Sequence, residues 1–389
     1  MHAAFVEAAG LKRKNAMLVG FDIRPLIFTG AGIRTYLYNL IVSLAKIEGL
    51  RQQLFVSSPS RIAWEDVSAT ISEDVVRLPH LNRLCGRFWE EFLLSSAVRK
   101  KKVDIFHGAR FFLPRRLACP SVVTVHDLAF KKFPEFVTRQ AFRDFDAMVA
   151  YSVQAARAVI VPSEATARDL FDLYKVGKNK VAVIHEAAGP AFRPSPDADR
   201  PRRLREKFRT GNKFILCVGT IEPRKNLVNL LEAYAMLKDN DEFTLVLAGG
   251  LGWRYGRILE KVKELALGTR VVFTGRVSDG ELVDLYNGCE VFVFPSYYEG
   301  FGLPVLEALG CACAVVCADT SSLTELFGDA CIFVDPHSAA SIERGLRKAL
   351  FDAAVRDRLR ARALEKAAGF SWAKAAGDTY AVYGQVLRG

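Results

Sequence analysis

The stretch EGFGLPVLEALG, residues 299–310, carries the local signals that decide the fold of its half of the chain. The preceding run, Val291 to Phe294, is continuously apolar, which is typical of a short strand buried on both faces. Pro304 opens a segment of helix-forming residues, a position suited to the first turn of a helix. The sequence here therefore predicts a strand, a glycine-containing loop and a helix.

This turn also predicts a site for an anion that carries hydroxyl groups. The first amides of a helix have no partner within the helix and lie at the positive end of its dipole. Gly300 and Gly302 leave room for a ligand to approach those amides. Glu299 lies just before them and Glu307 lies inside the helix, where carboxylates accept hydrogen bonds from sugar hydroxyls. An ordinary turn with two solvated glutamates is the alternative interpretation.

Composition favours a two-domain protein with a basic first half. The chain has 389 residues, too many for one ordinary core, and 50% of them are hydrophobic. Of the formal net charge of +11, residues 1–200 contribute +9 and residues 201–389 contribute +2. This asymmetry indicates an anionic partner for the first half: a phospholipid surface, a phosphate-bearing substrate or nucleic acid. The basic clusters at 99–102, 115–116 and 131–132 have a solvated surface as their alternative interpretation.

The cysteines and the N-terminus indicate reduced thiols and no targeting segment. Most of the eight cysteines lie in or beside apolar runs, where thiols act as small hydrophobic groups. The pattern CACAVVC at 311–317 has no nearby histidine, so a zinc site is not expected. No apolar run approaches the roughly 18 residues of a membrane span. The first sixteen residues lack a signal-peptide pattern and are expected to be an extension ahead of the first strand.

Apolar strand patterns alternate with helical patterns along the chain, which predicts parallel sheets covered by helices. The proline-rich segment around 189–201 interrupts the alternation and is expected to be a linker. We therefore expect two doubly wound α/β domains with a ligand held between the carboxyl ends of the facing sheets. The expected strands are MLVGFDI, QLFVSS, VVRLP, VDIFHG, SVVTVHD, AVIVPS and VAVIHE before the linker, and FILCVGT, TLVLAGG, VVFTG, VFVFPS, CAVVCAD and CIFVDP after it.

Six motifs in order make the sequence resemble a family 4 retaining glycosyltransferase of the GT-B fold. The motifs are TGAGIRTYLYNL (29–40), VTVHDLAF (123–130), VPSEATARDL (161–170), GTIEPRKNL (219–227), FTGRVSD (273–279) and EGFGLPVLE (299–307). The forms GTIEPRKNL and VHDLAF are most similar to bacterial mannosyltransferases of polysaccharide or lipid-linked glycan assembly. The resemblance covers nearly the whole chain after about residue 17.

The resemblance implies two Rossmann-like domains that face a central cleft. Residues 1–188, joined by a C-terminal helix at 373–389, would form the acceptor-binding domain. Residues 189–372 would form the domain that binds a nucleotide sugar. Transfer of a hexose, with mannose from GDP-mannose favoured, to a hydroxyl of a glycan or lipid-linked acceptor is the expected reaction. A UDP- or dTDP-sugar donor (glucosyl, N-acetylglucosaminyl or rhamnosyl transfer) and a catalytically silent scaffold in a glycan-assembly complex are alternatives, as are a sugar-nucleotide epimerase and a nucleic-acid-binding protein.

Several residues of the second domain are implied to bind the donor. In this family, cations at Arg224 and Lys225 hold the diphosphate, and their grip strengthens as negative charge develops on the leaving group. Glu299 is implied as a catalytic residue at the donor sugar, and Glu307 as the acceptor of ribose hydrogen bonds. The remaining donor contacts implied by the motifs are Arg276, Val277, Gly300, Phe301, Gly302 and Leu303, with Gly30 and Gly32 from the first domain.

The first domain is implied to contribute one catalytic histidine and the acceptor contacts. His126, at the end of a predicted strand, matches the histidine that family members place near the reacting carbon. Acceptor contacts are expected from His107, Arg110, Phe111 and Asp127. Asp127 has the cap of the following segment as its alternative role, and a lone histidine such as His107 is more often structural.

The family transfers sugars with retention, and this sequence shows no convincing carboxylate nucleophile, so front-face transfer is expected. No Asp-x-Asp metal motif stands in a loop that suits one, so no metal or tightly bound cofactor is expected. The expected partners are a nucleotide sugar and a glycan or diphospholipid-linked acceptor, with an anionic membrane surface suggested by the basic half, and no nucleic acid. The expected location is cytoplasmic, at the inner face of the cytoplasmic membrane.

Overall fold

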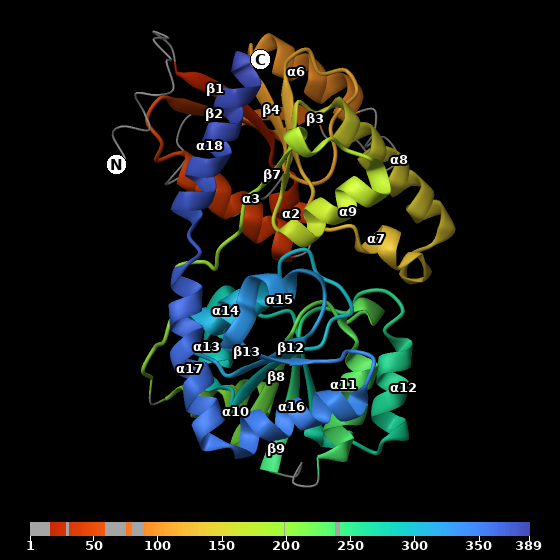
Figure 1. Cartoon of the computed structure of the whole chain (residues 1–389), viewed down its shortest axis with the longest axis vertical. Helices are drawn as coiled ribbons and strands as arrows, with labels where there is room; N and C mark the ends of the chain where they lie inside the picture. The colour runs from red at the N-terminus through yellow and green to blue at the C-terminus, as the bar shows by residue number, and fades with distance from the viewer. Residues whose placement is uncertain (1–15, 29–30, 59–74, 80–88, 198, 238–241) are drawn as a thin grey trace. The chain divides into compact units, whose positions relative to one another are not determined.

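The computed structural model describes residues 16–28, 31–58, 75–79, 89–197, 199–237 and 242–389, which form two compact α/β units (Figure 1). The first unit takes in the described residues up to Lys131, with Val137–His185 and Trp372–Gly389. The second takes in Lys132–Phe136 and Glu186–Ser371. The extension expected before the first strand lies outside the described residues except for residue 16.

A parallel sheet forms the centre of the first unit. In the described residues it has seven strands in the order β3-β2-β1-β4-β5-β6-β7. These strands are β1 (Met17–Asp22), β2 (Leu50–Ser58), β3 (Val75–Pro79), β4 (Ile105–Gly108), β5 (Ser121–Thr124), β6 (Ala158–Val161) and β7 (Val181–Val183). Its helical segments are α2 (Pro25–Phe28), α3 (Ala31–Leu44), η2 (Trp89–Leu94), α6 (Ser95–Lys100), α7 (Ala129–Lys132), α8 (Arg139–Ala155), α9 (Glu164–Tyr174), η4 (Lys178–Lys180) and α18 (Trp372–Arg388). The short segment η3 (Pro134–Phe136) belongs to the second unit.

The second unit repeats this plan with a six-stranded parallel sheet, again counted over the described residues, in the order β10-β9-β8-β11-β12-β13. Its strands are β8 (Lys213–Val218), β9 (Phe243–Ala248), β10 (Val271–Gly275), β11 (Val291–Phe294), β12 (Val315–Ala318) and β13 (Cys331–Val334). Its helical segments are α10 (Arg200–Phe208), η5 (Pro223–Lys225), α11 (Leu227–Met236), α12 (Gly256–Glu264), η7 (Gly268–Arg270), α13 (Asp279–Gly288), α14 (Leu303–Gly310), α15 (Ser321–Phe327), η8 (Gly328–Ala330), α16 (Ala339–Phe351) and α17 (Ala353–Ala368).

Burial on both faces explains why the strands appear in the sequence as continuous apolar runs. In β8, Phe214 and Leu216 pack into one core cluster, whereas Ile215 and Cys217 pack into the cluster on the opposite face. Helices α10, α13, α14 and α17 contribute to the first of these clusters, and α11, α12 and α16 contribute to the second. All the strands expected from the sequence are present, and the doubly wound α/β fold class is confirmed.

Strand order reverses at one point in each sheet. In the first sheet β1 lies between β2 and β4, and in the second β8 lies between β9 and β11. In open parallel sheets, ligands bind outside the carboxyl ends of the strands at such a reversal. The expected sites are therefore the loops that follow β1 and β4 in one unit and β8 and β11 in the other.

The helical segment at 89–100 is divided into two helical types. Trp89–Leu94 is a π-helical turn, and the α-helix α6 begins at Ser95. The Ser95 hydroxyl donates to the carbonyl of Glu90, 3.2 Å away and five residues earlier. That contact satisfies a carbonyl that an α-helix would have bonded at a shorter spacing, so it supports the wider turn.

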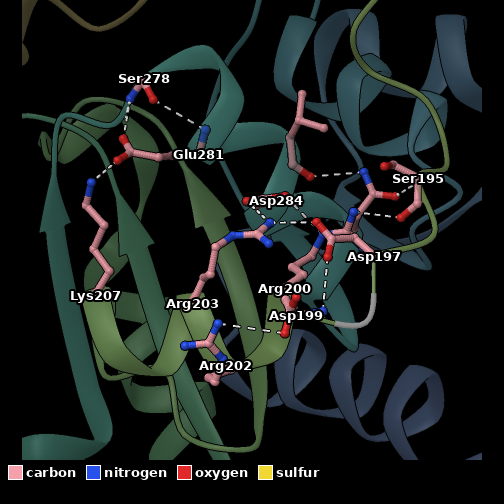
Figure 2. A network of polar contacts seen from close by, with 12 residues as sticks. Ser195, Asp197, Asp199, Arg200, Arg202, Arg203, Lys207, Ser278, Glu281 and Asp284 are labelled. Atoms are coloured by element: carbon pink, nitrogen blue, oxygen red, sulfur yellow. Dashed lines mark hydrogen bonds and ion pairs between the residues drawn. The ribbon is translucent and has the colours of Figure 1, made fainter.

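The expected linker is fixed to the second unit by a polar network (Figure 2). Arg200, at the start of α10, donates from Nε to Asp284 Oδ1 at 3.1 Å, and its side chain is 8% exposed. Asn287 Oδ1 accepts a bond of 2.9 Å from the backbone amide of Ser195. Both partners lie on α13, whose first turn is closed by a capping box between Ser278 and Glu281. The linker therefore helps to hold α13 in place.

Candidate functional site

The loop after β8 presents two cations on a single 3-10 turn. Pro223 begins this turn, and Asn226 ends it in the left-handed conformation, with φ of 58°. The Asn226 side-chain amide donates to the carbonyls of Pro295 and Pro336, at 3.0 and 2.6 Å, and so ties this loop to the loops after β11 and β13. Arg224 and Lys225 are therefore held by local backbone geometry at the strand reversal of the second sheet.

Both cations pair with Glu299 from the loop after β11. Lys225 Nζ lies 2.6 Å from Glu299 Oε1, and Arg224 Nη1 lies 3.0 Å from Oε2. Burial by itself would raise the pKa of the Glu299 carboxyl, but the two cations outweigh it and lower that pKa to about 2. Glu299 is therefore ionised at neutral pH. The structure brings these three predicted residues together.

Arg224 is held from its other side by Glu222. Its Nε and Nη2 atoms lie 3.1 Å from Glu222 Oε1, and Nη1 donates to the carbonyl of Tyr298 at 3.0 Å. Glu222 is 2% exposed, and burial raises the pKa of its carboxyl. The guanidinium therefore has a fixed orientation, which a flexible surface arginine would lack.

The turn of 299–303 requires a glycine at position 302, both for its backbone conformation and for the core side chain that packs against it. Gly302 has φ of 97°, and a Cβ atom at this position would lie 2.6 Å from a Leu323 side-chain carbon. Helix α14 begins at Leu303, with Pro304 in its first turn. The side chains of Phe301 and Leu303 are buried in the core cluster, so these two residues can reach a ligand only through their backbone.

Two serines that the sequence analysis did not identify support this turn. Ser321 and Ser322, at the start of α15, both donate to the carbonyl of Glu299, at 2.9 and 3.0 Å. Ser321 Oγ also accepts from the Glu299 amide at 3.1 Å. The serine pair lies 22 and 23 residues beyond Glu299, so only the packing of α15 against β12 and the loop brings them there.

Glu307 lies in the second turn of α14 and is 7% exposed. Its Oε2 atom accepts a hydrogen bond of 3.0 Å from the hydroxyl of Tyr286 on α13. Burial raises the pKa of its carboxyl to about 8, with the Tyr286 bond acting in the opposite direction. The residue expected to accept hydrogen bonds from a sugar is therefore a buried acid whose charge depends on its surroundings.

Arg276 and Val277 follow β10. Arg276 is exposed, and its side chain passes over Gly250, where a Cβ atom would lie 3.0 Å from Nε. Val277 is half-buried against the core cluster. Gly250 thus leaves the space that the Arg276 side chain fills, and the arginine stays at the surface, as a contact to a nucleotide would require.

In the first unit, a charged pocket lies at the carboxyl ends of β1 and β4. The pocket is partly open to solvent, and Asp22, Glu90, Arg110 and Phe112 are among its lining residues. Arg24 pairs with Asp22 at 2.6 Å and with Glu90 at 2.7 Å. Arg110 pairs with Glu90 at 3.2 Å and keeps a side chain that is 28% exposed. Of the predicted acceptor contacts, Arg110 is the one that lines this pocket.

His126 follows β5 and is half-buried. Its Nε2 atom lies 2.9 Å from the carbonyl of Ala109 and must donate to it. The ring lies edge-on to Tyr36 and Phe111, with ring centres 4.7 and 5.4 Å away. These contacts fix both the tautomer and the orientation of the imidazole.

The structure corrects the expectation for His107. It is fully buried, with Nδ1 2.6 Å from the Tyr383 hydroxyl and Nε2 2.7 Å from the Thr124 hydroxyl. Burial, with a smaller contribution from His126, lowers the pKa of His107 to about 3. Both ring nitrogens are engaged, so His107 anchors helix α18 and has no atom left for an acceptor.

Phe111 is also corrected, because it is 6% exposed and packs within the core cluster of the first unit. Asp127 takes the capping alternative: its Oδ1 accepts from the Ala129 amide at 2.9 Å, at the start of α7. Gly32 lies in the first turn of α3, and nothing lies within 4 Å of the position of a Cβ atom there. Gly30 lies outside the described residues.

The described residues contain no cluster of three or more His, Cys, Asp or Glu side chains that could hold a metal ion. The cysteines in the described ranges are free, and all but Cys119 are buried. None of the helices within those ranges is both long enough and apolar enough to cross a membrane.

Comparison with known proteins agrees with this arrangement. The model of glycosyltransferase family 4 matches residues 30–188, and that of the glycosyl transferases group 1 matches residues 200–366. O-antigen chain mannosyltransferase B of Escherichia coli is 32% identical over 292 residues, which are 74% of this chain and 76% of that protein. The serotype-specific mannosyltransferase WbdA of Escherichia coli is 35% identical over 240 residues, 60% of this chain but only 29% of that longer protein.

Among solved structures, sucrose-phosphate synthase of Thermosynechococcus elongatus superimposes with a TM-score of 0.76. The match covers 96% of this chain and 99% of that one at 20% identity, so it concerns the fold alone. The two domain models and the extended similarity to the mannosyltransferase together identify the family: the chain belongs to the group 1 and family 4 glycosyltransferases and has the GT-B fold.

Proposed function

We propose that this glycosyltransferase moves mannose from GDP-mannose to a hydroxyl of a glycan or lipid-linked glycan, with retention at the anomeric carbon. The observation that carries the choice of sugar is the similarity to two Escherichia coli proteins named mannosyltransferases, at 32% and 35% identity. The motif-by-motif resemblance in GTIEPRKNL and VTVHDLAF supports the same choice.

In this proposal the second unit binds the donor through three kinds of group. Arg224 and Lys225 hold the diphosphate, and the amides of 300–303 add uncharged donors at the start of α14. Glu307 accepts hydrogen bonds from the ribose hydroxyls, and Glu299 from the hexose. Arg276 and Val277 contact the nucleotide base. Because Arg224 and Lys225 are already fixed by Glu222 and Glu299, little ordering is needed when the diphosphate binds.

The proposed step is a front-face transfer. The bond between the anomeric carbon and the β-phosphate oxygen breaks, and the acceptor oxygen bonds to the same face of that carbon. The acceptor proton passes to the departing phosphate oxygen, so the products are the glycoside and GDP. Arg224 and Lys225 stabilise the charge that develops on the leaving group. We assign His126 to the donor sugar in this step, as a hydrogen-bonding group with a fixed ring.

For the acceptor we assign Arg110 and, as a residue not foreseen from the sequence, Glu90. Two carboxylates and one guanidinium group line this pocket, and Arg24 pairs with both carboxylates, so the formal charges of the whole cluster balance. A charge-balanced pocket with an aromatic side chain suits the hydroxyls of a neutral sugar better than a second diphosphate. Asp127 is kept as an acceptor contact only through its backbone, because its carboxylate caps α7.

The test is turnover of a donor panel in EDTA: GDP-mannose, UDP-glucose, UDP-N-acetylglucosamine and dTDP-rhamnose. We expect GDP-mannose alone to be turned over, with an α-linked product by NMR. Turnover of a UDP or dTDP donor instead would contradict the proposed donor. Binding of nucleotide sugars without any turnover would favour a silent scaffold, and activity that depends on a divalent ion would contradict metal independence.

We further propose that the basic first unit attaches the enzyme to an anionic membrane surface on the cytoplasmic side. Residues 99–102 at the end of α6 are all exposed, whereas Lys131 pairs with Asp146 at 2.8 Å. Binding to anionic liposomes should fall when Arg99, Lys100, Lys101 and Lys102 are changed to glutamine. Equal binding of the wild type to neutral and anionic liposomes would contradict this attachment.

A further inference from the structure

The carboxylate of Glu307 has an unusual set of neighbours for a buried acid. It is 7% exposed, and its hydrogen-bond partner is the hydroxyl of Tyr286, 3.0 Å from Oε2. Within the described ranges, no lysine, arginine or histidine forms an ion pair with it. Burying an ionised carboxylate without a paired cation costs free energy. The protonation state and the orientation of the Glu307 carboxyl group therefore depend on its hydrogen bond with the Tyr286 phenol.

The other titratable groups around Glu307 do not stabilise its negative charge. Asp279, on α13, acts to raise the pKa of Glu307, while burial keeps the nearby thiol of Cys311 protonated by raising its pKa to about 12. On α17, which packs against α14, Arg360 approaches Glu290 and Arg362 pairs with Asp329 and Glu365. Tyr286 is therefore the neighbouring group that favours the carboxylate form.

Tyr286 is itself held rigidly. It is 1% exposed, and its carbonyl accepts from the thiols of Cys289 and Cys313 at 3.3 and 3.0 Å. Its ring packs edge-on against Phe192 and Phe292, with ring centres 5.8 and 5.4 Å away. Burial raises the pKa of the phenol well above its ordinary value, so the hydroxyl keeps its proton and acts as the donor. The phenol cannot turn away without disturbing both α13 and the core.

We propose that Tyr286 is a positioning residue that fixes the Glu307 carboxylate so that it accepts hydrogen bonds from the vicinal hydroxyls of the donor ribose. This inference rests on the proposed donor site. The phenol occupies one acceptor position on Oε2 and leaves Oε1 and the second position of Oε2 for the diol. Tyr286 touches neither donor nor acceptor, and it acts through Glu307 alone.

The test compares Tyr286→Phe with Tyr234→Phe as a matched control. Tyr234 is equally buried in the same unit, but its hydroxyl donates to the carbonyl of Phe243 at the amino end of β9. The proposed donor site lies at the other end of the strands, beyond their carboxyl ends. The measurements are the dissociation constants of GDP and 2′-deoxy-GDP by calorimetry, and kcat and KM for the donor.

At pH 9, where Glu307 is ionised, we expect the wild type to bind GDP about tenfold more tightly than 2′-deoxy-GDP, as for one hydrogen bond to a charged group. In Tyr286→Phe this ratio should fall to about two, with a higher donor KM and kcat changed less than about threefold. Tyr234→Phe should keep the wild-type ratio. A merely structural role for Tyr286 would lower the melting temperature and leave the ratio unchanged, which would overturn the inference.

The outcomes separate this inference from the proposed function. If the wild type binds neither GDP nor UDP, the proposed donor site is wrong. If it binds GDP but Tyr286→Phe retains full discrimination against 2′-deoxy-GDP, only the role of Tyr286 is wrong. Should Tyr286→Phe fail to fold, Glu307→Gln replaces it, and an undiminished preference for GDP over 2′-deoxy-GDP in that variant also overturns the inference.

Discussion

Lys225 Nζ lies 2.6 Å from Glu299 Oε1, although 74 residues separate the two in the chain. The same carboxylate reaches Arg224 through its other oxygen, at 3.0 Å. The two cations proposed to bind the donor diphosphate thus already form ion pairs with one carboxylate. That carboxylate occupies the position in which a phosphate oxygen would accept from them. In the proposed donor site, a diphosphate would therefore compete with Glu299 for the same positive charge.

Replacing Glu299 with glutamine should separate binding from catalysis. Removing the internal anion leaves both cations to the ligand, so the dissociation constant for GDP should fall, by about tenfold for one removed charge. Turnover should nevertheless be lost, because the carboxylate proposed to contact the hexose is gone. Calorimetry with GDP and a turnover assay measure the two effects. Weaker GDP binding in this variant would contradict the competition.

Lys225→Ala should reduce kcat by about 10²–10³, the usual cost of removing one group that stabilises transition-state charge. The matched control is Lys213→Ala: Lys213 forms an exposed pair with Glu242 at the amino end of β8, where it is far along the strand from the site. That control should keep wild-type kcat and lose less than about 1 kcal/mol of stability. Equal kcat in the two variants would argue against a catalytic role for Lys225.

The buried Glu307 predicts a specific dependence of stability on pH. Its pKa, ordinarily 4.5, is raised to about 8 by burial, so the folded protein binds this proton more tightly than the unfolded chain. Its contribution to the free energy of unfolding therefore decreases as pH rises from 4.5 to 8. Glu307→Gln should remove that decrease, and its melting temperature relative to wild type should increase from pH 5 to pH 8. A constant difference would show that Glu307 does not titrate in this range.

Gly302→Ala should destabilise the turn that precedes α14. The backbone has φ of 97° there, and a Cβ atom would approach Leu323 to 2.6 Å, so we expect a loss of about 2–4 kcal/mol together with weaker GDP binding. Gly280→Ala is the control, because α13 leaves open space at that position and alanine favours a helix. Denaturant unfolding measures both variants, and equal stability would contradict the strain assigned to Gly302.

Tyr383→Phe should loosen the C-terminal helix from the first unit. It removes a hydroxyl 2.6 Å from His107 Nδ1 and leaves a buried nitrogen without its partner, at a cost of about 1–3 kcal/mol. Tyr380→Phe, on the same helix but only half-buried, should cost less than about 0.5 kcal/mol. The free energies of unfolding of the two variants measure this difference, and equal losses would contradict the role assigned to the Tyr383 hydroxyl.

His107 adds a dependence on pH with the opposite sign to that of Glu307. Its pKa falls from 6.5 to about 3 on burial, so the unfolded chain binds this proton more tightly. The stabilisation is present above pH 6.5 and is lost as pH falls towards 3. His107→Gln should flatten this part of the pH profile, and an unchanged acid limb would show that other groups cause it.

The sequence by itself determined the strands, the turns and the chemical type of the residues proposed to bind the donor. Continuous apolar runs predicted central strands such as β11 and β12 because these strands are buried on both faces. Gly302 and Pro304 predicted the start of α14 because their backbone preferences are local. The positions of Arg224, Lys225, Glu299 and Glu307 in their motifs were equally visible.

Only the tertiary structure decided which of these residues meet and which are inaccessible. Glu299 forms ion pairs with two cations, and Glu307 accepts a hydrogen bond from the phenol of Tyr286. His107 is hydrogen-bonded to Tyr383, which lies 276 residues away in the chain. His107 and Phe111 looked available in the sequence but are buried, since exposure depends on what packs over a residue. Pairing across such distances is set by strand order and helix packing, which no local pattern encodes, and that is the physical reason why the charges of Glu307 and His107 were not predictable.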